Sequence, residues 1–346
     1  MNVLADFHHP DLWWSLHLLF EKRLGWNLFR PVGMEWFDEG YYHINDEGAG
    51  FHSAQELSKH LLVDSMRVSS DFPDQYEGVE TQQGCEDFPL FKTVNFWELS
   101  ECKMDILLCS THLNEKPTFR LRERFFPEAK IIRQVGNMLE EVDPKLCLNV
   151  LCSDTSSFAH CKSENKLFYH QEFDLEMAKY EPPRKDNRIS SFRHHFYLDV
   201  INHEIFEALR VLLPEFDFYS YGEGNPSGKI WIKRKEIKAI KDSTFVWQTK
   251  SWDGYGFNIH RAMALGRPVI VNPTDYVGKT AEPLLEDEVT CLFIEDKATD
   301  MANKIAFYSE PERHLKMCEN AHRRFQEVVD FDKEFAQIKE FLGRLV

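Results

Sequence analysis

The chain has 346 residues and a mass of 40.8 kDa, a length that predicts about two domains. Charged residues make up 28% of the chain and hydrophobic residues 43%, a composition that excludes disordered, collagen-like and low-complexity proteins. With 41 basic and 57 acidic residues the formal net charge is −16, which argues against a protein that holds nucleic acid over a broad face.

The start of the sequence and its cysteines indicate the cellular compartment. The first residues, MNVLADFHHPD, do not have the basic start and long apolar run of an export signal, and no stretch reaches the roughly 18 apolar residues of a spanning helix. We therefore expect a cytoplasmic protein whose eight cysteines are reduced thiols. Cys147, Cys152 and Cys161, near His160, do not have the spacing of a zinc site, so no metal is predicted.

The first half of the chain predicts alternating strands and helices. A helix capped by Asp11 is expected to end at Gly25, and the pattern loosens between about 35 and 100, with a short helix near 53–62. The predicted strands are 2–7, 26–32, 105–110 and 129–135. This alternation predicts a parallel sheet covered on both faces.

The polar segment 180–187 contains two prolines and is the predicted linker to a second α/β unit. The strands predicted beyond it are 188–194, 217–222, 243–248, 267–272 and 290–295. The predicted helices are 199–213, 233–241, 257–265, 301–307, 311–329 and 332–345. The expected architecture is α/β, with two doubly wound domains that face each other across a cleft.

The segment 251–273, SWDGYGFNIHRAMALGRPVIVNP, contains the highest concentration of candidate functional residues. It lies between two predicted strands. Gly254 and Gly256 let the backbone bend closely over a ligand, and they open a helix whose free N–H groups favour phosphate. A purely structural turn is the alternative. A dinucleotide site is disfavoured, because Ile259 stands where that fingerprint has its third glycine.

The order acidic–Gly–aromatic–Gly, then Ala-Met-Ala and Gly-Arg-Pro-Val-Ile, resembles the donor-site signature of GT-B glycosyltransferases, in the form seen in phage and environmental sequences. The resemblance implies a Rossmann-like acceptor-side domain at 1–175, a Rossmann-like nucleotide-sugar domain at 188–325, and a C-terminal helix at 326–346 that returns to the first domain. In many retaining members two glutamates separated by seven residues mark the motif helix. Asp253 stands at the first of these positions and Arg261 at the second.

The same resemblance implies a donor site for a nucleotide-diphosphate sugar, with UDP among the expected nucleotides. Asp253 would hold sugar hydroxyls, and Arg261, which reverses the expected charge, would meet the diphosphate instead of the ribose. For Arg193 a surface arginine is the alternative, and for Tyr221 and Gly222 a plain turn. The residues expected to bind the donor are Arg193, Tyr221, Gly222, Lys250, Gly254, Gly256, His260, Arg261, Gly278 and Lys279.

His8 and His9 directly follow the first predicted strand, at the edge where doubly wound domains build their sites. A histidine there is expected to deprotonate the attacking acceptor hydroxyl near neutral pH, with helix capping or packing as the alternative. The predicted catalytic residues are therefore His8, His9 and Asp253.

Two basic stretches, 116–133 and 229–241, stand out in the acidic chain, and each is either a solvated helix face or a binding surface. The first stretch combines Arg120, Arg122 and Arg124 with interleaved phenylalanines at 119, 125 and 126, a composition that suits an anionic polymer, so these arginines are predicted to bind the acceptor. The acceptor is expected to be a cell-surface glycan or a hydroxymethylated base in DNA.

The sequence as a whole predicts a metal-independent GT-B glycosyltransferase that moves a hexosyl or pentosyl group from a nucleotide-diphosphate sugar and uses no further cofactor. Two alternatives remain open. One is a sugar-nucleotide epimerase or hydrolase of the same fold, and the other is a degenerate relative that only binds glycans or nucleic acid.

Overall fold

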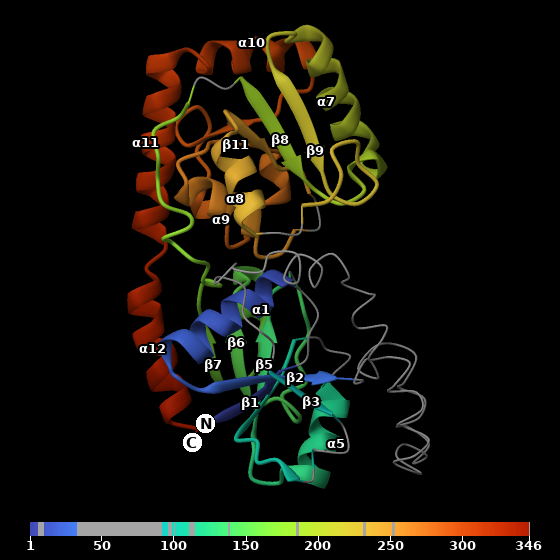
Figure 1. Cartoon of the computed structure of the whole chain (residues 1–346), viewed down its shortest axis with the longest axis vertical. Helices are drawn as coiled ribbons and strands as arrows, with labels where there is room; N and C mark the ends of the chain where they lie inside the picture. The colour runs from blue at the N-terminus through green and yellow to red at the C-terminus, as the bar shows by residue number, and fades with distance from the viewer. Residues whose placement is uncertain are drawn as a thin grey trace. The chain divides into compact units, whose positions relative to one another are not determined.

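A computed structural model describes residues 1–5, 10–32, 92–95, 99, 101–110, 115–137, 139–184, 187–230, 233–250 and 253–345. The chain divides into two compact units. Unit 1 comprises Met1–Phe173 together with Phe331–Val346, and unit 2 comprises Asp174–Asp330. The last helix of the chain therefore belongs to the unit that contains its first strand, and Figure 1 shows the two termini close together.

Unit 1 is built on a seven-stranded sheet with the order β3-β2-β1-β4-β5-β6-β7 (Figure 1). Its strands are β1 (Asn2–Ala5), β2 (Asn27–Val32), β3 (Lys92–Asn95), β4 (Ile106–Cys109), β5 (Lys130–Val135), β6 (Asn149–Cys152) and β7 (Asn165–Phe168). All neighbouring strands run parallel. The carboxyl ends of the strands therefore lie at one edge of the sheet, which we call the carboxyl edge.

Alternate residues of the central strands pack into two different cores, as the two-residue period of a strand requires. Ile106 and Leu108 join a core with α1 (Pro10–His17) and α12 (Phe331–Gly343), whereas Leu107 and Cys109 face a core with α5 (Glu115–Phe125). Because α12 contributes Ile338, Phe341 and Leu342 to the first core, the end of the chain is part of the interior of unit 1. A short helix, α6 (Thr155–His160), completes the unit.

The single helix predicted after Asp11 is two helices in the structure. The helix α1 continues into a π-helix at Leu18–Arg23, whose wider turns place Arg23 beside both segments that connect the two units. The Nε and Nη2 atoms of Arg23 donate to Oε1 of Glu172 at 2.9 and 2.6 Å, and Nη1 donates to Oδ1 of Asp332 at 2.7 Å. Arg23 therefore binds two residues of unit 1 that lie next to the two points where the chain passes between the units.

Unit 2 contains a five-stranded parallel sheet with the order β12-β11-β10-β8-β9. The strands are β8 (Arg188–Phe192), β9 (Asp217–Tyr221), β10 (Phe245–Trp247), β11 (Val269–Val271) and β12 (Cys291–Phe293). The helices are α7 (Val200–Leu212), α8 (Lys233–Lys241), α9 (Phe257–Ala264), α10 (Ala298–Tyr308) and α11 (Pro311–Val328), with 3₁₀ turns at Phe196–Leu198, Pro273–Asp275 and Glu282–Leu284.

Both faces of this second sheet are covered. Phe245 and Trp247 of β10 pack against α7, α10 and α11 through Phe206, Met301 and Met317. Val246, which points to the opposite face, is also fully buried. A strand that is apolar on both faces is typical of a parallel sheet between two layers of helices, so the predicted two-sheet α/β architecture is confirmed.

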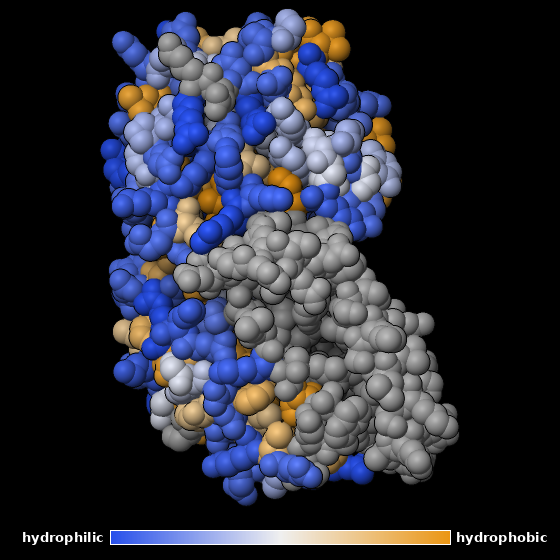
Figure 2. Space-filling view, in the orientation of Figure 1, coloured by the Kyte–Doolittle hydropathy of each residue, from blue (hydrophilic) through white to orange (hydrophobic). Residues whose placement is uncertain are grey.

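The described surface on the face seen in Figure 2 is mostly hydrophilic, with apolar side chains in small separate patches. None of the helices in the described ranges combines the length and the apolar character needed to cross a lipid bilayer.

Candidate functional site

The strand order of unit 2 identifies the place where a ligand site is expected. The chain leaves β8 for β9 on one side and then crosses to β10 on the other side, so β8 and β10 are neighbours whose connections diverge. In doubly wound sheets ligands bind at the carboxyl ends of two such strands. Arg193 directly follows β8, and Gln248, Thr249 and Lys250 directly follow β10.

Arg193 bridges these two strand ends. Its Nη1 atom donates to the carbonyl oxygen of Thr249 at 2.7 Å and forms an ion pair with Asp199, the residue before α7. The side chain of Arg193 is still 20% exposed. A fixed and partly exposed arginine of this kind is well suited to a bidentate contact with phosphate.

Gly222 lies against the backbone of Arg193. Its φ angle is +127°, and a Cβ atom at this position would lie 2.8 Å from the carbonyl oxygen of Arg193. Asn225 donates to the carbonyl oxygens of Arg193 and Tyr221, and Tyr221 stacks on Phe192 with ring centroids 5.3 Å apart. The strand-end turn and the arginine loop therefore form one packed assembly.

Asp253 of the motif segment is 7% exposed and is held from two loops. Its Oδ2 atom accepts hydrogen bonds from Nε2 of Gln248 at 2.9 Å and from the hydroxyl group of Tyr276 at 3.2 Å, and Lys250 lies 3.3 Å from Oδ1. Burial, and then the Asp253 carboxylate, raise the pKa of Tyr276 well above its usual value, so Tyr276 acts as a donor here.

The glycines of the motif shape the start of α9. Gly256 caps the helix with a φ angle of +80°, and its carbonyl oxygen accepts from the N–H groups of Ile259 and His260. The His260 ring is fully buried, donates through Nδ1 to the same carbonyl oxygen at 3.0 Å, and stacks on Tyr255 with centroids 4.3 Å apart. Gly254 is buried in the same turn.

Arg261 is 2% exposed and points into a buried ion pair with Glu236 of α8, with Nη1 and Oε1 3.1 Å apart. Lys233 pairs with the other oxygen of the same carboxylate at 2.9 Å, and the Arg261 guanidinium lies over the ring of Phe257. The contact of Arg261 with a diphosphate therefore stays a prediction, while its partner in the described structure is a carboxylate from a neighbouring helix.

Lys279 approaches the same strand ends from the segment after β11. It is 5% exposed, with its ammonium group 5.6 Å from the centre of the Tyr276 ring. Burial raises the pKa of the nearby Asp275, and the charges that act on Asp275 come from Lys279, Asp199, Arg193 and Asp253. These charged groups therefore lie in the region of Asp275. The N–H group of Gly278, in contrast, donates to Glu282 at 2.7 Å.

Several residues of this site had no sequence signal of their own. Gln248 and Tyr276 hold Asp253, and Asn258 donates to the carbonyl oxygen of Phe192 and to Oε1 of Gln248, both at 3.3 Å. They belong to three separate segments that only the fold brings together. Asp199 had one usable signal, since an aspartate before a predicted helix commonly marks its start.

In unit 1, the predicted catalytic residues His8 and His9 lie outside the described residues. Arg120, Arg122 and Arg124 lie on α5, where Arg122 covers the ring of Phe119 and Arg124 the ring of Phe125. Because α5 follows β4 and leads into β5, its last turn lies near the amino ends of the strands, away from the carboxyl edge.

Among the residues with a described position, no three His, Cys, Asp or Glu side chains gather into a group that could hold a metal ion. The seven cysteines of this part of the chain are free thiols.

No protein-family model and no curated protein sequence matches the chain. Solved structures match it over both units. HepE of Anabaena in complex with UDP is 13% identical, with a TM-score of 0.59 and 99% of each chain covered. A glycosyltransferase from Rickettsia africae is 10% identical, with a TM-score of 0.60, over 99% of this chain and 98% of that one.

TarM of S. aureus is 15% identical, with a TM-score of 0.55 over 72% of this chain, and this chain spans 57% of the length of TarM. These neighbours are GT-B proteins, and the two parallel sheets with a returning C-terminal helix agree with them. The chain therefore has the GT-B fold, as its motif predicted.

Proposed function

We propose that this GT-B chain is a glycosyltransferase that takes a sugar from a nucleotide-diphosphate donor and transfers it to an acceptor hydroxyl group. The observation that carries the proposal is the set of cations at the diverging strand ends of unit 2. Arg193 directly follows β8, Lys279 lies in the segment after β11, and the ammonium group of Lys250 lies 3.3 Å from Asp253. The amino end of α9 adds the N–H groups of its first turn.

This arrangement suits the departure of a nucleoside diphosphate. Negative charge develops on the leaving phosphate in the transition state, and fixed cations stabilise that charge without having to reorganise. Asp199 and the Thr249 carbonyl fix Arg193 in advance. Asp253 is fixed through Oδ2, and Oδ1 has capacity for a further hydrogen bond, which we assign to a sugar hydroxyl.

Similar folds support a uridine nucleotide. HepE and TarM are both solved with UDP, and the pneumococcal GtfA, which is 12% identical with a TM-score of 0.53, is an O-GlcNAc transferase solved with UDP and GlcNAc. We extend the proposal to a UDP-sugar for this reason. Metal-independent transfer, and proton removal from the acceptor by His8 or His9, complete the mechanism that we propose.

The donor half of the proposal is tested by thermal shift with UDP, GDP, ADP and their sugars. A bound ligand raises the free energy of unfolding by about 2.7 kcal/mol at a hundred times its Kd, so a true donor stands out in the screen. Arg193→Gln should weaken binding of the selected nucleotide by about thirtyfold, because a charge-assisted contact is lost.

Arg188→Gln is the matched control, since Arg188 begins the same strand at its other end and covers the ring of Tyr219. No shift with any nucleotide, or equal losses in the two variants, would reject the donor site. Product analysis with the selected sugar nucleotide then separates transfer from epimerisation and hydrolysis, which consume the donor without an acceptor.

A further inference from the structure

The loop after β5 lies at the carboxyl edge of the unit 1 sheet. We refer to its described residues, 136–137 and 139–143, as the β5 loop. The loop is joined to the interior by Arg133, whose side chain is fully buried at the end of the strand. Nε of Arg133 pairs with Glu115 of α5, and Nη2 pairs with Glu140 of the loop, both at 3.1 Å.

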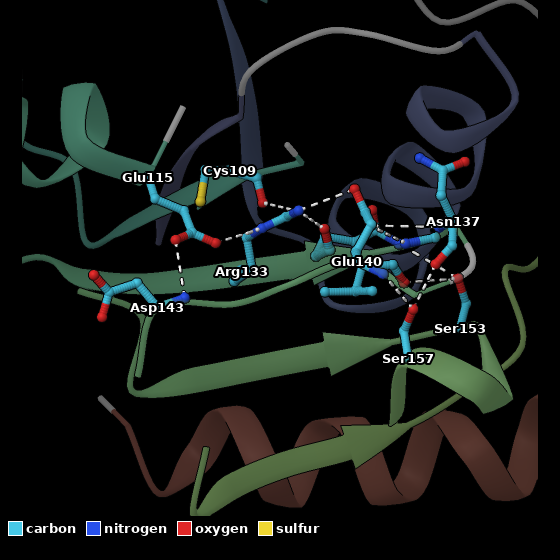
Figure 3. A network of polar contacts seen from close by, with 11 residues as sticks. Cys109, Glu115, Arg133, Asn137, Glu140, Asp143, Ser153 and Ser157 are labelled. Atoms are coloured by element: carbon cyan, nitrogen blue, oxygen red, sulfur yellow. Dashed lines mark hydrogen bonds and ion pairs between the residues drawn. The ribbon is translucent and has the colours of Figure 1, made fainter. Parts of the chain in front are cut away.

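Glu140 is the central residue of the network in Figure 3. Its Oε2 atom accepts from the N–H groups of Gly136 at 3.2 Å and Asn137 at 3.4 Å. Its own N–H group donates to the hydroxyl oxygen of Ser157 in α6 at 2.9 Å, and that hydroxyl group donates to the carbonyl oxygen of Asn137 at 2.7 Å. The backbone of the loop is therefore fixed on both sides.

The network holds one residue in an unfavourable conformation. Leu139 has a φ angle of +53°, in the left-handed region that costs a residue with a Cβ about 1 kcal/mol, and its N–H group lies 3.4 Å from the Ser156 hydroxyl. Its side chain is nevertheless 57% exposed, so core packing does not offset the strain. Glycine or asparagine would satisfy this backbone at lower cost.

The side chain of Asn137 has a complementary character. Figure 3 shows its amide group pointing away from the network while its backbone is held by Ser157 and Glu140. An amide group on a fixed backbone, with donor and acceptor capacity, thus lies two residues from an exposed and strained apolar group, at the edge where doubly wound sheets bind ligands. Strained residues that the surrounding structure holds in place are concentrated at functional sites.

We propose that Leu139 and Asn137 bind the acceptor, and that the acceptor is a carbohydrate. A sugar ring presents C–H groups on its face and hydroxyl groups at its edge. Leu139 packs on the C–H face, Asn137 exchanges hydrogen bonds with the hydroxyl groups, and Glu140 is the positioning residue for both. This assignment rests on the proposed function, because an acceptor requires a donor reaction.

The test compares Leu139→Asn with wild type, using the sugar nucleotide selected by thermal shift. Acceptors are a panel of p-nitrophenyl monoglycosides and duplex DNA that contains a hydroxymethylated pyrimidine. We expect the variant to be more stable, with Tm higher by about 2 °C, because asparagine tolerates the left-handed backbone. We also expect KM for the glycoside to rise about fivefold, with donor affinity and donor hydrolysis unchanged.

Leu148→Asn is the matched control, because Leu148 is 65% exposed and precedes β6 at the opposite edge of the same sheet. A glycoside KM that stays at the wild-type value in Leu139→Asn, or rises equally in both variants, overturns the acceptor site. Wild-type transfer to DNA alone overturns the carbohydrate assignment and leaves the donor site in place. A wild type without donor binding or turnover rejects the proposed function itself and this inference with it.

Discussion

At the scale of single residues, the pair formed by Arg261 and Glu236 explains how a charge reversal is accommodated in the motif helix. The resemblance to GT-B proteins led us to expect an acidic residue at position 261, and the arginine found there would be costly to bury alone. Glu236 supplies the opposite charge from α8, and Lys233 supports Glu236 from the solvent side. A buried pair of this kind is stable only while both partners are present.

Arg261→Met should therefore reduce the free energy of unfolding by about 3 kcal/mol, because Glu236 then stays buried with Lys233 as its partner. The double variant Arg261→Met/Glu236→Gln should recover most of the loss, as measured by urea denaturation. A coupling energy near zero in this double-mutant cycle contradicts the pair. If Arg261 also contacts the diphosphate, the double variant binds UDP more weakly although its stability is restored.

A second residue makes the stability of unit 2 depend on pH. Burial and, to a smaller extent, the charge of Arg267 lower the pKa of His314 on α11 to about 4. In the unfolded chain the same imidazole titrates near pH 6.5. Between these values the unfolded state binds a proton that the folded state does not, so the free energy of unfolding falls as the pH decreases from about 6.5 towards 4.

His314→Leu should remove this contribution. When the pH is lowered from 7.5 to 5, the free energy of unfolding of wild type should fall by about 2 kcal/mol more than that of the variant. Denaturant unfolding at both pH values measures this difference. His160→Leu, at the exposed end of α6, serves as the control. Parallel pH profiles for wild type and His314→Leu would show that this residue is not the source.

At the scale of elements, the turn after β9 and the loop after β8 hold each other in place. Gly222 and Gly228 are joined by a backbone hydrogen bond of 2.9 Å, and both have φ angles in the left-handed range, +127° and +71°. Their surroundings differ. A Cβ atom at Gly222 meets the Arg193 backbone, whereas a Cβ atom at Gly228 meets no atom within 4 Å.

Gly222→Ala and Gly228→Ala therefore form a matched pair. Both should lose about 1 kcal/mol of stability through backbone strain. Gly222→Ala should in addition displace Arg193 and weaken UDP binding by about tenfold, measured by calorimetry. Equal nucleotide affinities in the two variants would show that the turn does not position the arginine.

The elements that the sequence predicted are those with continuous apolar character. Strands such as β4 and β10 are buried on both faces, and their sequences are correspondingly apolar. In contrast, β6 and β7 were not predicted, and β7 contains Lys166. The ammonium group of Lys166 donates to the carbonyl oxygens of Phe158 and Cys161, which is how a strand next to α6 accommodates a lysine.

The site follows the same division. Arg193, Lys250 and Asp253 lie in contiguous motifs, so the sequence singled them out as candidates. The contacts that fix Asp253 come from Gln248, which lies 5 positions before it, and from Tyr276, which lies 23 positions after it. No local sequence pattern links these residues. Contacts between side chains that are distant along the chain can be predicted from the sequence only when the residues recur at a regular spacing.

At the scale of the whole molecule, the net charge of −16 sets the response to salt. A polyanionic acceptor is repelled by most of such a surface and would have to bind locally, with an affinity that falls steeply as salt increases. The three arginines of α5 are the place that the sequence suggested, although they lie near the amino ends of the strands.

With a neutral glycoside as acceptor we expect KM to be unchanged between 50 and about 200 mM salt, in wild type and in the triple variant Arg120→Gln/Arg122→Gln/Arg124→Gln. Initial rates at several acceptor concentrations provide the measurement. A KM for hydroxymethylated DNA that rises with salt in wild type, and is higher and less salt-sensitive in the triple variant, would instead assign a polyanion to α5.

The return of α12 to unit 1 also sets an order of assembly during synthesis on the ribosome. Unit 2 is continuous in sequence and can complete its interior as soon as residue 330 has emerged. The nascent N-terminal part has to wait, because Ile338, Phe341 and Leu342 complete its hydrophobic core. The N-terminal part of unit 1 is made before unit 2 but finishes folding after it, and until α12 has been made its incomplete core is the surface that molecular chaperones would protect.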